Sequence, residues 1–340
     1  MATVHTWQRI GYSISVMRAL ITGINGFVGS NLADYLLAQG RYELWGLSRA
    51  PGRLPPRFHG RIAELYGDLT DRQAIQQLLS LARPDLIFHL AGQPFVPESF
   101  RDPAATLQIN ILGALHLFQA ILELQCPARV LVIGSYEEYG KISDRDLPIH
   151  EQCPLRPTNP YGVSKAAQGL LALQYHFSHG IDTVRVRPFN HIGPGQSVRF
   201  VAAAFAQQIA RIEHGLQPPI VQVGNLSARR DLTDVRDTVR AYALLAEHGQ
   251  SGAVYNVGSG HAVMMQALLD QLLALSSIAV EVRPDPERMR PIDIPTVVCD
   301  RSLIHAQTGW EPAIPLQQTL RDILDYWRGE VSATLGQRSP

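Results

Sequence analysis

Two residues four positions apart, Tyr161 and Lys165, have the types and the spacing that acid–base chemistry requires. If the segment around them is helical, the phenol and the ammonium lie on one face, one turn apart. A nearby positive charge stabilises the phenolate of a tyrosine, whose ordinary pKa of about 10 is too high for proton exchange at neutral pH. The pair therefore predicts a general acid or base. The alternative is an ordinary surface pair, and other motifs must decide.

A glycine-rich turn lies between the first predicted strand and the first predicted helix. Its glycines permit a tight turn and close approach of the backbone to a pyrophosphate, which the amino end of the helix attracts. The alternative is a plain strand-to-helix turn. Because a parallel sheet is predicted to continue after it, we predict a dinucleotide site. Its residues are Gly23, Asn25, Gly26, Phe27, Val28 and Gly29.

The ends of the next predicted strands indicate which dinucleotide binds. Arg49 follows the second strand, where an acidic residue would hold the adenosine ribose of NAD. An arginine suits the 2′-phosphate of NADP instead, although Arg49 could also lie on an exposed loop. We therefore predict NADP(H). After the third and fourth strands, a carboxylate for the adenine amino group and small residues against the cofactor are predicted at Asp68, Leu69, Leu90, Ala91 and Gly92.

These residues must be positioned by alternating strands and helices. Short β-branched or leucine-rich runs alternate with amphipathic ones, which predicts an α/β fold with a Rossmann-type, doubly wound parallel sheet. We predict strands at 18–22, 43–47, 62–66, 86–90, 129–133 and 183–187, and helices at 29–39, 71–82, 104–125 and 161–179. Thr70 and Gln73 would form a capping box for the second helix.

After Pro188 the alternation loosens and predicts a smaller α/β substrate-binding lobe. Helices are predicted at 200–214, 234–248, 262–276, 301–308 and 316–328, and strands at 220–223 and 253–257. We assign 17–190, with 226–257 returning to it, to the NADP-binding domain, and 191–225 and 258–330 to the lobe. A ligand would bind in the crevice between them. Residues 1–16 are expected to precede the natural start at Met17 or to be a disordered leader.

The composition limits the partners of the chain. It has 340 residues, 46% of them hydrophobic, and its 30 basic and 30 acidic residues balance. We therefore expect neither nucleic acid nor a membrane as a partner, and we find no apolar run near the ~18 residues that a span requires. Residues 1–16 lack the pattern of a secretory signal. The three distant cysteines match no metal spacing, so we predict reduced thiols, no metal and a cytoplasmic location.

The glycine turn, Ser135 at the end of the fifth strand, and the Tyr161/Lys165 pair occur together and in order. In this the chain resembles the extended short-chain dehydrogenase/reductases that act on nucleotide sugars, from residue 17 to about residue 327. The resemblance implies that Ser135 hydrogen-bonds the substrate oxygen and Tyr161 exchanges its proton. It also implies that Lys165 holds the nicotinamide ribose and polarises the tyrosine.

Two further segments, 224–237 and 289–295, look like the GDP-sugar branch of that family. By this likeness Arg230 and Arg290 would clamp the diphosphate, Asp293 would bind a ribose hydroxyl, and Asn190 would line the sugar pocket. Forked guanidinium groups suit a diphosphate. Taken singly, each arginine is as well explained by a surface ion pair.

The segment 134–140 bears on the reaction. A 4,6-dehydratase needs a carboxyl group two residues beyond the serine, and Glu137 stands there, but the similar reductases carry it too. Tyr136 departs from the dehydratase pattern. We therefore favour NADPH-dependent reduction of the C4 keto group of a GDP-4-keto-6-deoxy-mannose, with Glu137 in the pocket. The alternatives are a GDP-mannose 4,6-dehydratase with tightly bound NADP, another nucleotide-sugar epimerase or dehydratase, and a non-catalytic NADP-binding protein.

The two long predicted helices, 104–125 and 161–179, resemble those that form a four-helix interface in the family. The resemblance implies a homodimer. Whether two such dimers associate into a tetramer stays open.

Overall fold

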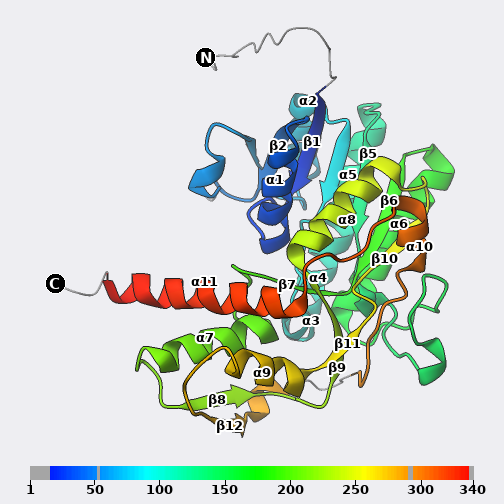
Figure 1. The fold of residues 1–340 in the computed structure, drawn as a ribbon. Coiled ribbons are helices and arrows are strands. Elements are labelled where there is room, and N and C mark those ends of the chain that lie inside the picture. Colours follow the sequence, from blue (N-terminus) through cyan, green and yellow to red (C-terminus); the bar gives the residue numbers. More distant parts are fainter. Residues whose placement is uncertain (1–15, 52–53, 290–293, 337–340) are drawn as a thin grey trace.

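The computed structural model of the chain describes residues 16–51, 54–289 and 294–336 (Figure 1). A seven-stranded parallel sheet forms its centre, in the order β10-β6-β5-β4-β1-β2-β3. Its strands are β1 Met17–Thr22, β2 Tyr42–Ser48, β3 Ala63–Tyr66, β4 Leu86–His89, β5 Arg129–Ile133, β6 Thr183–Pro188 and β10 Val254–Val257. The strand order reverses direction at β1 and β4, which places a crevice at their carboxyl ends. The predicted Rossmann-type class is confirmed.

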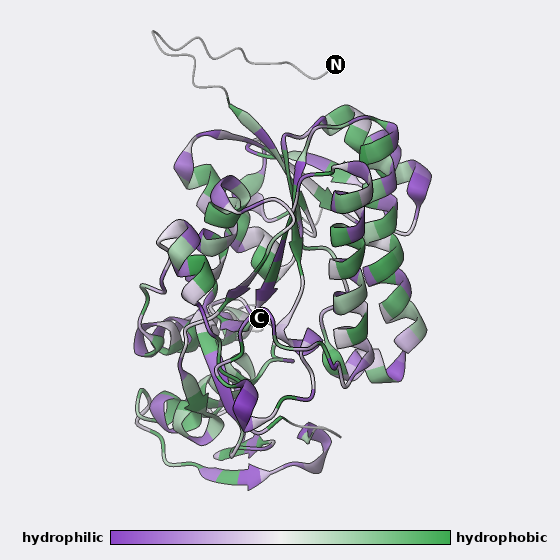
Figure 2. Ribbon diagram, turned by 90° about the vertical axis from the view of Figure 1, so that its right-hand side faces the viewer, coloured by the Kyte–Doolittle hydropathy of each residue, from purple (hydrophilic) through white to green (hydrophobic). Residues whose placement is uncertain are grey.

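Helices cover both faces of this sheet because its strands are apolar on both sides. In β1, Ala19 and Ile21 pack into the core on one face and Leu20 into the core on the other. The first face is covered by α1 Phe27–Gln39 and α8 Val235–His248, and the second by α2 Arg72–Ala82, α5 Gly113–Glu123 and α6 Pro160–His179. Figure 2 shows the strands between these two layers.

A smaller lobe with its own apolar core lies beyond the carboxyl end of the sheet (Figure 1). Its helices are α7 Val201–Glu213, α9 Met265–Leu273 and α11 Leu316–Gly336, which lies against α7. One small sheet pairs β8 Ile220–Val223 with β12 Glu281–Pro284. A second has the order β11-β9-β7, with β7 Asn190–Ile192, β9 Arg229–Asp234 and β11 Ala262–Met264.

Three predicted elements differ in the structure. The helix predicted at 104–125 is divided into α4 Pro103–Leu107, a π-helical turn Gln108–Leu112 and α5, and α3 Val96–Arg101 precedes it. The helix predicted at 262–276 begins only at Met265, because residues 262–264 pair with β9. The capping box predicted at Thr70 and Gln73 is wrong, since Asp71 caps α2 by accepting from the Ala74 amide.

The domain boundaries also differ from those predicted. Within 226–257, β9 belongs to the small three-stranded sheet, and only α8 and β10 return to the large one. In the segment assigned to the lobe, α10 Ser302–Thr308 packs on α8 and β10, and Trp310 is buried in the core of the sheet domain. The predicted leader lies outside the described residues, apart from Val16.

One helical run is longer and more apolar than the sequence analysis allowed. By length and composition, Pro103–Glu123 is the single candidate for a membrane span in the described part of the chain. In the structure 44% of its apolar 18-residue window is buried. The helices α4 and α5 pack against α6, and α5 also packs against α2. Its inner residues belong to the core beneath the sheet, as in the core helix of a globular domain.

Candidate active site

The turn between β1 and α1 is shaped by its glycines. Gly23 has φ +75°, a conformation that residues with a side chain rarely adopt. A Cβ atom on Gly23 would lie 2.9 Å from Ala91 Cα, and one on Gly29 would lie 2.3 Å from the Gly23 carbonyl oxygen. The backbone of this turn therefore lies directly against the end of β4, at the reversal in strand order where the crevice opens.

This turn leaves hydrogen-bonding groups for an anion. The N-cap of α1 is Gly26, no side chain caps the first-turn amides, and no acidic residue lies in that turn. The Asn25 Oδ1 atom is also buried and has no hydrogen-bond partner among the described residues, but as an acceptor it would meet a donor and not the anion. Uncapped amides and the helix dipole favour a phosphate at such a position. The turn thus fits the pyrophosphate of a dinucleotide.

The groups predicted to hold the adenosine lie at the edge of the sheet. Arg49 and Asp68 are exposed and close enough that the Arg49 charge contributes to the lowered pKa of Asp68, after two hydrogen bonds from Thr70. Leu69 is buried. At the end of β4, Leu90 and Ala91 are half-buried and Gly92 is exposed.

The Ser135 hydroxyl and the Tyr161 phenol lie close enough at the end of β5 to affect each other. Ser135 begins the 3₁₀ turn Tyr136–Glu138, and Tyr161 lies in the first turn of α6, which Asn159 caps. Burial raises the pKa of Tyr161 most; the nearby Ser135 hydroxyl lowers it, and the charges of Glu137 and Glu138 raise it. Two converging hydroxyls are suited to hold one carbonyl oxygen and stabilise charge that develops on it.

Lys165 lies one turn after Tyr161 on α6, but its ammonium is held within the protein. The Nζ atom donates to the Ile133 carbonyl oxygen at 2.8 Å and to Gln168 Oε1 at 2.9 Å. Burial lowers the pKa of Lys165 to about 8, and the Glu138 charge acts in the opposite direction. The effects that dominate the Tyr161 pKa do not include Lys165 in this structure, so polarisation of the phenol by the lysine stays a prediction.

Glu137 is buried and held by two donors. The Tyr136 hydroxyl donates to its Oε1 at 3.0 Å, and the Asn159 side-chain amide donates to its Oε2 at 2.9 Å. The Tyr136 ring stacks on Phe189, with 5.5 Å between ring centroids. Tyr136 therefore both fills the space beside Ser135 and fastens the neighbouring carboxylate.

The sequence analysis missed two buried polar residues beside the lysine. Asn110, in the π-helical turn, donates to the Gln93 carbonyl oxygen and to Ser164 Oγ, and accepts from the Gln93 amide. Gln168 holds the Lys165 ammonium from one turn further along α6. The only sign of Asn110 was its place at the start of the run 110–118, in which His116 is the one other polar residue.

On the substrate side the structure describes three of the five predicted residues, Glu137, Asn190 and Arg230. Asn190 begins β7, and its Oδ1 atom is buried without a partner among the described residues, as a sugar-binding acceptor would be. Arg230 in β9 is buried and donates to the carbonyl oxygens of Arg229 and Ile294. Arg290 and Asp293 lie outside the described residues. Within the described ranges, no group of three His, Cys, Asp or Glu residues could hold a metal ion.

Comparison with known families gives a match over most of the chain. Residues 20–323 match the family model for GDP-mannose 4,6 dehydratase. A GDP-6-deoxy-D-mannose reductase of Pseudomonas aeruginosa is 41% identical over 314 residues, which cover 92% of this chain and 98% of the relative. A GDP-mannose 4,6-dehydratase of Vibrio cholerae is 28% identical over 350 residues, covering 90% of this chain and 92% of the relative.

Solved structures match over a similar span. The structure of RMD from Pseudomonas aeruginosa in complex with NADPH has a TM-score of 0.81 and 39% identity, covering 92% of this chain and 99% of that one. A UDP-glucose 4-epimerase of Thermus thermophilus in complex with NAD has the same TM-score at 28% identity, again covering 92% and 99%.

Proposed function

The chain belongs to the GDP-mannose 4,6 dehydratase family, within the extended short-chain dehydrogenase/reductases, and from this premise we propose that it is an NADPH-dependent reductase. It reduces the C4 keto group of a GDP-4-keto-6-deoxy-mannose to the hydroxyl of a GDP-6-deoxyhexose of the GDP-rhamnose type. A solved relative binds NADPH, and the uncapped first turn of α1 suits the pyrophosphate of that cofactor.

The identities carry the choice of reaction: 41% to the reductase against 28% to the dehydratase. The Glu137 contacts support it. In a dehydratase a carboxylate must take a proton from the sugar, and here both oxygens of that carboxylate already accept hydrogen bonds from the protein, from Tyr136 and Asn159. Each such hydrogen bond contributes about 0.5–1.5 kcal/mol.

The residues of the chain divide the work of the reduction. Bound NADPH supplies the hydride. The Ser135 hydroxyl holds the keto oxygen beside the nearby Tyr161 phenol. Tyr161 then gives its proton to the oxygen that acquires negative charge, and Lys165 supplies a positive charge one turn away. The raised pKa of Tyr161 keeps the phenol protonated at neutral pH, as an acid in the reduction must be.

Two assays separate the reductase from the dehydratase. The purified protein is mixed with GDP-mannose alone, and a 4-keto product is sought by its absorbance in alkali. We expect none. When a separate dehydratase first supplies the keto sugar, we expect NADPH to be consumed. A 4-keto product from GDP-mannose without added reductant would exclude a function limited to reduction.

We also propose a homodimer joined through the helical run 103–123 and α6. These two elements pack side by side and leave apolar side chains exposed, with Phe177 77% and Leu170 57% accessible. The others are Leu112, Leu122 and Val163. Sedimentation should give twice the monomer mass. Substitution of Leu170 and Phe177 by glutamate should give monomers, and an unchanged mass would contradict this interface.

A further inference from the structure

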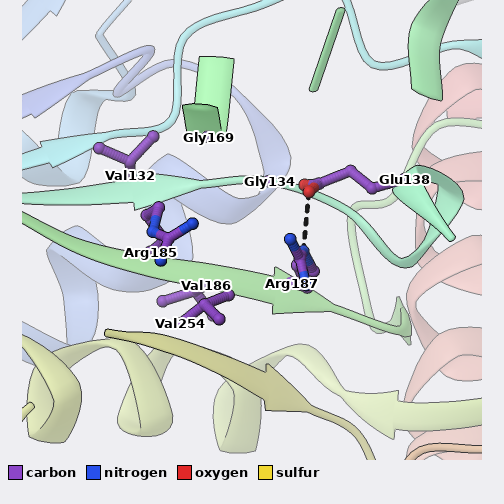
Figure 3. A pocket seen from close by; sticks show the side chains of 8 residues that line it. All are labelled: Val132, Gly134, Glu138, Gly169, Arg185, Val186, Arg187 and Val254. Carbon is purple, nitrogen blue, oxygen red and sulfur yellow. Dashed lines mark hydrogen bonds and ion pairs between the residues drawn. The ribbon is translucent and has the colours of Figure 1, made fainter. Parts of the chain in front are cut away.

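A buried ion pair lies directly behind the serine and the lysine of the site. Glu138 Oε2 accepts from Arg187 Nε at 2.7 Å, and both side chains are almost wholly inaccessible, at 2% and 8% (Figure 3). Arg187 also donates to the Tyr139 hydroxyl and to the Glu151 carbonyl oxygen. Neither charge reaches solvent, and the reduction described above uses neither of them.

The second carboxylate oxygen of this glutamate holds the catalytic backbone. Glu138 Oε1 accepts from the Ser135 amide at 2.9 Å, while Ser135 Oγ accepts from the Glu137 amide, and together they form a capping box. Gly134 makes room for this carboxylate. A Cβ atom on Gly134 would lie 2.1 Å from Glu138 Oε1, whereas one on Gly169 would make an ordinary van der Waals contact with its Oε2, at 3.8 Å.

Lys165 meets the same stretch of backbone. Its ammonium donates to the Ile133 carbonyl oxygen, two residues before the amide that Glu138 holds. Glu138 is the charged group that most supports the protonated form of this buried lysine, against the effect of burial. A cavity of about 10 Å³, room for about one water molecule, lies between Glu138, Gly169 and Arg185. The charges of Glu138 and Arg187 are thus shielded from solvent, and charges shielded in this way act strongly on each other.

We propose that Glu138, anchored by Arg187, is a positioning residue of the reduction, which fixes the Ser135 backbone and supplies the counter-charge for the Lys165 ammonium. The inference rests on the proposed function for its kinetic consequences, and on the geometry alone for its effect on the lysine. An ion pair with only a structural role would stabilise the fold without changing the position of Ser135 or the pKa of Lys165.

The charged and titratable groups that face Glu138 lie on β6, on α6 and in the segment 139–151. Arg185 and Arg187 lie on β6, and Tyr161 and Lys165 on α6. Tyr139 and Glu151 border Arg187. Removal of the negative charge of Glu138 lowers the pKa of both Lys165 and Tyr161. The two shifts have the same sign, so the loss of function at alkaline pH must move to lower pH whichever group causes it.

The test uses Glu138→Gln, which keeps an acceptor for the Ser135 amide but removes the charge. NADPH affinity and, separately, kcat and KM for the keto sugar are measured against pH, with the melting temperature. A second variant, Glu138→Gln with Arg187→Gln, leaves no buried charge without a partner. The control is Glu213→Gln, which breaks the ion pair of Glu213 with Arg328 in the lobe, 2.7 Å long and remote from the site.

We expect the alkaline fall in NADPH affinity to move down by about one pH unit in both Glu138 variants. We also expect kcat to drop by about tenfold with little change in KM, because Ser135 is held less well. The control should lose thermal stability alone. An unmoved alkaline limb in the Glu138 variants, or failure of both to fold, would overturn the proposal in favour of a structural ion pair. If the wild type binds NADPH but reduces no keto sugar, the proposed function is wrong. The pH dependence of NADPH affinity in the Glu138 variants still tests the effect of Glu138 on Lys165.

Discussion

The turn at Gly23–Gly29 and the layer around Ser135 and Lys165 contribute to one site in opposite ways. The turn leaves the first amides of α1 uncapped and the Asn25 oxygen without a partner among the described residues. In the layer, by contrast, the Ser135 hydroxyl, the Glu137 carboxylate and the Lys165 ammonium are already bonded to the protein. The cofactor side offers hydrogen-bonding groups that the protein does not use, whereas the catalytic side is held in place by the protein itself.

The difference teaches what each side requires of its residues. The turn at Gly23–Gly29 forms a backbone cradle, by which we mean that its backbone binds the cofactor directly. This requires space that side chains would fill, so almost any added atom should weaken cofactor binding. The layer around Ser135 and Lys165 depends on charges and hydrogen-bond donors that act on the substrate during the reaction. Substitutions there should therefore change the reaction rate and its pH dependence, while NADPH still binds. The predictions below test this contrast, from the largest effect to the smallest.

Replacement of Tyr161 by Phe should slow the reaction and leave cofactor binding nearly unchanged. Because the phenol supplies the proton, kcat should fall by about 10²–10⁴-fold. NADPH affinity, measured by fluorescence titration, should stay within a factor of a few of the wild-type value. Turnover comparable to that of the wild type would show that the phenol takes no part in the reaction and would contradict its role as the proton donor.

Replacement of Gly29 by Ala should do the reverse. The new Cβ would meet the Gly23 carbonyl oxygen, and relief of an overpacked contact costs about 1–3 kcal/mol. We expect NADPH affinity to fall by about tenfold or more and the melting temperature to drop. Ser30→Ala, which removes only a hydroxyl bonded to the Phe27 carbonyl oxygen, is the matched control. An unaltered NADPH affinity in the Gly29→Ala variant would contradict the prediction that the backbone of this turn binds the cofactor.

The pH profile of the wild type should reveal the buried lysine. The pKa of Lys165 is lowered to about 8 in the cofactor-free protein, so its charge is present below that pH and lost as the pH rises through it. Since kcat/KM reports groups of the free enzyme, it should fall above about pH 8, by about tenfold per pH unit. Lys165→Met should lack this limb. A wild-type profile that stays flat to pH 10 would show that the charge is not needed.

Replacement of Tyr136 by Phe should have the smallest effect. It keeps the stack on Phe189 and removes the hydrogen bond to Glu137. Thermal denaturation should show a loss of about 0.5–1.5 kcal/mol in the free energy of unfolding. The reductase rate should change little, because the carboxylate moves no proton in that reaction. A rate loss as large as that of Tyr161→Phe would give Glu137 a direct role.

How far the sequence predicted the molecule depended on whether the information was local. The glycine turn, the six leading strands and the spacing of Tyr161 and Lys165 follow from periodicity and from residues near one another in the chain. The strand β9 reads Arg-Arg-Asp-Leu-Thr-Asp and has no apolar alternation, so only its pairing with β7 and β11 makes it a strand. Glu138 reads as a surface charge, and its burial depends on Arg187, 49 residues away.

The partners of the lysine were equally hidden. The expected contact was with the phenol on the same helix, whereas the ammonium is held by the Ile133 carbonyl oxygen of β5 and by Gln168. Only the packing of α6 on the sheet brings that carbonyl within reach. Spacing along a helix predicts which side chains share a face, but not which of several acceptors a buried charge will choose.

The most direct test of the account follows the hydride itself. NADPH carrying deuterium at the transferable position of its nicotinamide ring is incubated with the protein and a GDP-4-keto-6-deoxy-mannose, and the product is analysed by NMR and mass spectrometry. The account predicts one deuterium in the product sugar, bonded to C4. A product without deuterium, or with the label at C6, would contradict reduction at C4.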